Sequence, residues 1–166
     1  SVFQCWGRYQ KKAYLIDQMR GKWAPADLIR NARAFYEKHH RAASPVAYMS
    51  VEEAAAGLTL IQDLRKKGIP TKGVIRHRDK VTRVKQILAY QATGMVWIPK
   101  EASWLPAFEQ ECAAFREDGK SRHDDQVDVF ADGVFLCLGK GTSILSVIGG
   151  RRADRTTPAP ENSGII

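Results

Sequence analysis

The order of its apolar patterns constrains the fold of this chain more than any other feature. Two strand-like runs come first, Val2–Tyr9 and Ala13–Met19, and the polar link Gln10–Lys12 joins them. Two such runs separated by a short polar link are typical of an antiparallel hairpin. Stretches with a helical period and short strand-like stretches then alternate along the chain. A hairpin followed by this alternation predicts an α/β fold in which a mixed central sheet is flanked by helices.

The alternating stretches are bounded by residues that start or stop regular structure. Five helices are expected. The first runs from Pro25 to about His39, the second contains Leu58 and stops at Gly68, and the third runs from Val81 to about Gly94. The fourth begins after Ser103, which can cap it, and the last runs from about Asp124 to Leu138. Short strands are expected at Val46–Val51, Val74–Ile75 and Val96–Ile98. In such sheets, functional sites gather at the carboxyl ends of strands. Glu52 follows the strand that ends at Val51, so its carboxylate is a candidate for a functional site.

Length and composition favour one globular domain. The chain has 166 residues, of which 44% are apolar and 27% charged, and this suffices for one core but not for two. No apolar run approaches the roughly 20 residues of a membrane-spanning helix. Cys5, Cys112 and Cys137 are far apart and form no CxxC pair, so we expect buried thiols. The domain is expected over residues 1–138, with residues 139–166 as a flexible tail or linker.

Positive charge is concentrated in one segment. The net charge is +8, and nine Lys and Arg side chains fall within residues 65–85, opposed only by Asp79. We call this segment the basic stripe. A solvated helix face is the commoner origin of such a run, but acids pooled elsewhere favour a polyanion partner such as a nucleic acid. The candidate DNA-binding residues are Lys72, Arg76, Arg78, Lys80, Arg83 and Lys85.

Negative charge is pooled at the start of the last expected helix. Asp124, Asp125 and Asp128 fall within its first two turns. Acids gain about 0.3–1 kcal/mol each at a helix N-terminus, but one acid would serve that purpose. Carboxylates gathered in this way are typical of a divalent-cation site. Together with Glu52, they could hold two Mg²⁺ ions about 4 Å apart for phosphodiester cleavage.

Several segments resemble, in order, the nuclease domain of the phage large terminase subunit. They are SVFQCWG, KAYLIDQMRGKW, VEEAAAGLTLIQDLRKKGIP, DKVTRV, GMVWIP, SWLPAFEQECAAF and HDDQVD, and they cover about residues 1–138. The resemblance implies an RNase H-like fold. It also implies an endonuclease that uses two ions of Mg²⁺ or Mn²⁺ to cut double-stranded viral DNA during genome packaging.

The resemblance also assigns roles to individual acids. Glu52 matches the family's acid five residues before a Gly, here Gly57, and Asp124 and Asp125 match its late acidic pair. Glu52 and one member of that pair would ligate metal, and which member is essential stays open. Asp128 matches the further acid one turn on, which would help the ligands or hold them in place. The family's first catalytic Asp lies on a strand just upstream of the SVFQCWG segment, so we expect it to be absent from these 166 residues.

The resemblance further implies partners and a location. The partners would be the terminase ATPase domain, the small terminase subunit and the portal protein, in the cytoplasm of the bacterial host cell and away from any membrane. No GxxxxGK[ST] loop of an ATPase is present in the sequence. Three alternatives stay open: a resolvase or transposase-type nuclease of the same fold, a catalytically dead remnant that binds DNA or the portal, and a basic fragment without a function of its own.

Overall fold

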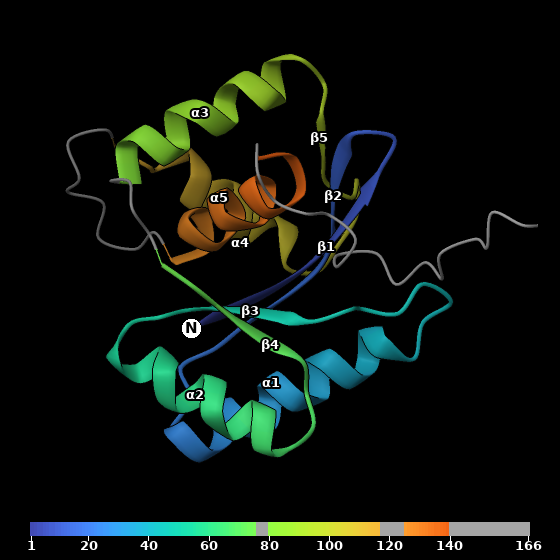
Figure 1. Ribbon diagram of the computed structural model, residues 1–166. Helices are drawn as coiled ribbons and strands as arrows, with labels where there is room; N and C mark the ends of the chain where they lie inside the picture. Colours follow the sequence, from blue (N-terminus) through green and yellow to red (C-terminus); the bar gives the residue numbers. More distant parts are fainter. Residues whose placement is uncertain (76–79, 117–124, 140–166) are drawn as a thin grey trace, which may run out of the picture.

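The computed structural model describes residues 1–75, 80–116 and 125–139 (Figure 1). Its elements are, in chain order, β1 Val2–Tyr9, β2 Lys12–Arg20, α1 Pro25–His40, β3 Met49–Glu52, α2 Ala55–Lys66, β4 Thr71–Val74, α3 Lys80–Ala92, β5 Val96–Trp97, α4 Leu105–Ala113 and α5 Asp125–Leu138. The opening hairpin and the later alternation of helices and strands confirm the predicted α/β class. None of the helices in these described ranges is long and apolar enough to cross a membrane.

The strands of the described residues form two sheets. The first has the order β1-β2-β5 and is mixed, because β1 is antiparallel to β2 and β2 is parallel to β5. The second contains β3 and β4, which are parallel. Residues of β1 and β3 line a common cavity between the two sheets. The mixed sheet is therefore present as predicted, but it is divided into two parts.

The turn of the hairpin uses two residues in the left-handed region. Gln10 and Lys11 have φ angles of 47° and 61°, as in a type I′ turn, whose twist matches that of the flanking strands. Tyr9 then pairs with Lys12, and the register shifts between Cys5 and Trp6. The link between the strands is thus one residue shorter than the sequence suggested.

The first core lies between the β1-β2-β5 sheet and the C-terminal helices. α5 packs against β1 and β2, and α3 and α4 pack against α5 (Figure 1). Leu15 of β2 meets Phe108 of α4 and Phe130 of α5, all buried. The Trp6 and Phe130 ring centroids are 5.3 Å apart. This core fixes the position of α5 over β1.

The second core lies between the β3-β4 sheet and the helices α1 and α2. Its buried residues are Ala32, Tyr36, Leu60, Leu64 and Ile69. Phe3 of β1 packs against this core as well, and its ring stacks 6.0 Å from that of Phe35. The start of β1 therefore connects the two cores.

Three local predictions are wrong. The strand expected at Val74–Ile75 is β4, which runs from Thr71 to Val74. The strand expected at Val46–Val51 begins only at Met49, because the backbone of Val46 bonds to the end of α1, with Val46 N donating to the carbonyl of His39 at 3.4 Å. Ser103 does not cap α4: the N-cap is Trp104, without a side-chain hydrogen bond, and a proline occupies the first turn.

Candidate active site

Glu52 is held at the end of β3 by contacts of its backbone. It pairs with Val74 of β4, and the first turn of α2 lies directly against it. A Cβ atom on Gly57 would lie 1.9 Å from the carbonyl oxygen of Glu52, so only glycine permits this approach. Gly57 therefore helps to set the position of the candidate acid.

The acids at the start of α5 share one face of the helix. Asp125, Asp128 and Asp132 are spaced at i, i+3 and i+7. The side chain of Asp125 is 70% exposed, whereas those of Asp128 and Asp132 are 20% and 23% exposed. Asp124, the other member of the late acidic pair, lies outside the described residues.

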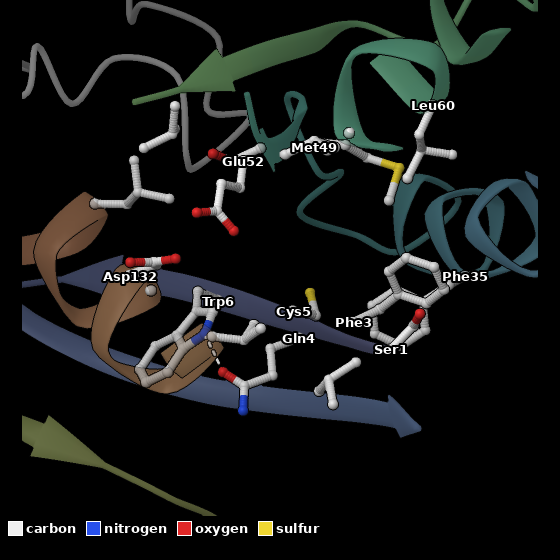
Figure 2. A pocket seen from close by; sticks show the side chains of 18 of the residues that line it. Ser1, Phe3, Gln4, Cys5, Trp6, Phe35, Met49, Glu52, Leu60 and Asp132 are labelled. Atoms are coloured by element: carbon white, nitrogen blue, oxygen red, sulfur yellow. Dashed lines mark hydrogen bonds between the residues drawn. The ribbon is translucent and has the colours of Figure 1, made fainter. Parts of the chain in front are cut away.

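A cavity of about 480 Å³ brings these distant segments together. Its walls include Glu52 from β3 and Asp125, Asp128 and Asp132 from α5. Figure 2 shows the Glu52 and Asp132 carboxylates pointing into this cavity from opposite sides. Four carboxylates from two distant segments therefore line one cavity. Asp132 is an addition to the acids predicted from the sequence, and its helical spacing from Asp125 and Asp128 is the signal that could have found it.

Arg83 joins two of these acids. Its Nη1 donates to Asp132 Oδ1 at 2.5 Å and its Nη2 to Asp128 Oδ1 at 2.8 Å. Only 7% of this residue is exposed. Its position in the basic stripe had suggested a phosphate contact, but its guanidinium group is directed at carboxylates inside the protein.

A buried hydrogen-bond network holds the first turn of α5. The carboxylate of Glu111 accepts hydrogen bonds from the backbone N–H and the side-chain amide of Gln126, each at 2.6 Å. Gln18 of β2 donates to Gln126 Oε1 at 2.7 Å, and Gln126 is fully buried. Arg20 Nη1 lies 3.4 Å from Glu111 Oε2. This network fixes the helix start that carries the acids, and no sequence pattern indicated it.

The other candidate DNA-binding residues lie at different places. Lys72 is exposed on β4, with its Nζ 4.1 Å from the ring centroid of Tyr48, and Lys85 is exposed on α3. Lys80 begins α3, but its side chain is outside the description, as are Arg76 and Arg78 entirely. DNA binding by this set stays a prediction.

Asp17 lies outside the acidic group. It is on β2, and its Oδ2 is 2.7 Å from Lys38 Nζ and 2.9 Å from His39 Nε2 on α1. Burial alone would raise the pKa of Asp17, but hydrogen bonds from Lys38, the backbone of Gln18 and His39 outweigh it and lower that pKa. Its role is thus a contact between β2 and α1.

The donor chemistry of the cavity fits hard divalent cations. Carboxylate oxygens are the ligands that Mg²⁺ and Mn²⁺ prefer, and four carboxylates line this wall. Among the described residues, however, no three His, Cys, Asp or Glu side chains come close enough to hold one ion. The described acids therefore supply the right atoms without completing a coordination sphere.

Comparison with known proteins finds one family model that matches most of the chain. The family model described as "Terminase RNaseH-like domain" matches residues 1–135. No curated protein and no solved structure matches the chain. The matched range contains Glu52 and every described acid of the cavity.

Proposed function

This chain belongs to the family of terminase RNase H-like domains, and on that premise we propose that it is a metal-dependent endonuclease that cleaves double-stranded viral DNA during genome packaging. The observation that supports the proposal is the convergence of Glu52 with the α5 acids in one cavity. The residues come from segments more than 70 positions apart in the sequence, and a solvated surface role would not require them to meet.

The proposal assigns roles to the chain's own residues. Glu52 and either Asp124 or Asp125 hold divalent cations, and Asp128 supports them. When bound, two such cations would supply Lewis-acid activation of water and stabilisation of the leaving 3′ oxygen. Exposed lysines such as Lys72 and Lys85 attract the phosphate backbone. The ATPase domain, small subunit and portal protein of a terminase are the proposed partners, and the host-cell cytoplasm is the proposed location.

We infer a place for the family's first catalytic Asp in this arrangement. Within the described residues, β1 pairs only with β2 and β3 only with β4, and both strands border the acidic cavity. A strand inserted between them would join the two sheets. It would also present an acid beside Glu52 and the α5 carboxylates, and so add the ligand that the described set lacks.

Plasmid cleavage tests the proposal. The protein, expressed with any polypeptide that its gene encodes ahead of Ser1, is incubated with supercoiled plasmid and Mn²⁺ or Mg²⁺. We expect nicked and linear products, and we expect Glu52→Ala or Asp125→Ala to reduce the rate by about 100-fold or more, because each removes a candidate ligand. Asp27→Ala, at an exposed acid that pairs with Arg30 on α1, is the control and should cut normally. Undiminished cutting by both variants would reject this site.

One observation supports a second candidate, a DNA-binding module without catalysis. The described carboxylates do not complete a metal site, while exposed basic residues remain on β4 and α3. A salt-sensitive gel shift with no cleavage under any divalent metal would favour this second function.

A further inference from the structure

Arg83 is a cation enclosed beside the acidic cavity. Its exposed fraction is 7%, and its two terminal nitrogens donate to carboxylates of α5. Its Nε is also buried and has no hydrogen-bond partner among the described residues. Burying a guanidinium group is costly unless it is paired, so the two carboxylates account for its position.

The two contacts need the shape of an arginine side chain. Asp128 and Asp132 are one helical turn apart on α5, while Arg83 belongs to α3. The planar fork of the guanidinium group reaches both carboxylates at once, with Oδ1 of each acid as the acceptor. A lysine ammonium is a point charge on a flexible stem and does not reproduce this geometry.

The charges of the cavity wall explain why such a contact is needed. Glu52, Asp125, Asp128 and Asp132 all contribute carboxylates to it, and like charges repel one another. Asp128 and Asp132 are the two most enclosed of the α5 acids. A cation between them offsets their repulsion and fixes the rotamers of both side chains.

We propose that Arg83 is a positioning residue that orients Asp128 and Asp132 for cation binding, and that it is not a phosphate contact. The inference rests on the proposed nuclease function and deepens it, because it adds Asp132 to the acids that the site uses. Partners that hold metal-ligating carboxylates by hydrogen bonds typically change metal affinity or activity by 10- to 100-fold when they are lost. Arg83 should therefore affect the metal and the chemical step, and leave DNA affinity unchanged.

Three variants test this role. Arg83→Met removes the charge and the fork, and Arg83→Lys keeps the charge but loses the fork. Arg33→Met is the matched control, because Arg33 also pairs with a carboxylate, Glu37, but on the exposed surface of α1. Thermal melting of each variant is measured first, and if Arg83→Met does not fold, Arg83→Lys alone carries the test.

The first readout is calorimetric titration with Mn²⁺ in the absence of DNA. We expect Arg83→Met to weaken Mn²⁺ binding by about 10- to 100-fold, Arg83→Lys to fall between it and the wild type, and Arg33→Met to match the wild type.

The second readout is the slope of log affinity for DNA against log salt concentration, without divalent metal. It should be unchanged in Arg83→Met, whereas Lys72→Met should reduce it by about 0.9 if Lys72 contacts a phosphate. In plasmid cleavage, kcat should fall at unchanged KM.

The outcomes separate this inference from the proposed function. Wild-type protein that neither binds Mn²⁺ nor cuts DNA would overturn the nuclease proposal, and the role of Arg83 would fall with it. Wild-type binding and cutting, with both Arg83 variants equal to the wild type, would overturn only the Arg83 inference. A salt slope lowered by about 0.9 in Arg83→Met would also overturn it, since Arg83 would then be a phosphate contact.

Discussion

Glu52 and the acids of α5 line one cavity, and the elements that carry them pack closely at two glycines. A Cβ atom on Gly57 would lie 1.9 Å from the Glu52 carbonyl oxygen, and one on Gly133 would lie 2.1 Å from Trp6 Nε1. Glycine inside a helix costs about 1 kcal/mol relative to alanine. Gly133 lies in the middle of α5, so close packing of this helix on β1 offsets that cost.

Replacing Gly57 with alanine should displace the candidate catalytic acid. The added methyl group overlaps backbone of β3, so β3 or α2 must shift, at a cost of roughly 1–3 kcal/mol in unfolding free energy. We expect plasmid cleavage to fall by about 10-fold or more, because a shift of about 1 Å misplaces Glu52. Urea denaturation and plasmid cleavage check both effects. Thr59→Ala, at an exposed position of the same helix, should change neither, and wild-type behaviour of Gly57→Ala would contradict the close approach.

Among the elements, α5 carries the largest share of the site, and its start depends on a neighbour. The buried carboxylate of Glu111 on α4 accepts hydrogen bonds from the backbone and side chain of Gln126. The first N–H groups of a helix have no partner within it, so Glu111 acts as a cap supplied by another helix. The period of apolar residues predicted α5 itself, but a single Gln among core positions carries no sign of its partner.

Loss of this cap should destabilise the protein measurably. Glu111→Ala leaves the buried backbone N–H of Gln126 without its acceptor and leaves Gln126 Nε2 with the Ala107 carbonyl alone, at a cost of about 2–3 kcal/mol in unfolding free energy. Glu111→Gln keeps the shape and one acceptor oxygen and should lose less. Urea denaturation monitored by circular dichroism measures the difference. Glu109→Ala, on the exposed side of the same helix, provides the comparison, and a Glu111→Ala variant no less stable than Glu109→Ala would argue against the cap.

At the scale of the whole molecule, a polar contact joins the sheet β1-β2-β5 to α1. Asp17 of β2 pairs with Lys38 and His39 at the end of α1. α1 packs against α2 and β1, so this contact ties the first sheet to the second core. His39 lies near the end of α1, where side chains are usually exposed, but its own side chain is only 12% exposed.

The Asp17 contact should make stability depend on acid pH. The folded-state pKa of Asp17 is lowered from its ordinary value of 3.8, so its contribution is fully present above about pH 4 and is lost as the pH falls through the folded value. Asp17→Asn should therefore cost roughly 1 kcal/mol at pH 7, and the difference from the wild type should shrink below pH 4. Urea denaturation between pH 3 and 7 measures this. Asp27→Asn serves as the exposed-acid reference, and a difference for Asp17→Asn that is constant with pH would contradict the assignment.

The sequence by itself determined the local elements and the identity of the acids. Apolar period and breaker residues act between neighbours in the chain, so they predicted the hairpin, the helices and the position of Glu52 after a strand. The spacing of Asp125, Asp128 and Asp132 likewise follows from the helical repeat. The ordered motifs identified the family, and the family model covering residues 1–135 confirms it.

Only the tertiary structure decided which distant groups meet. Arg83 belongs to a basic stripe in the sequence but pairs with Asp128 and Asp132 in the fold, because the packing of α3 on α5 turns its side chain inward. The division of the sheet and the burial of Gln126 were also beyond local pattern. The divided sheet and the buried Gln126 both result from contacts between segments far apart in the chain. The free energy of such a contact depends on the shape and charge of both segments, whereas a local sequence pattern describes only one segment at a time.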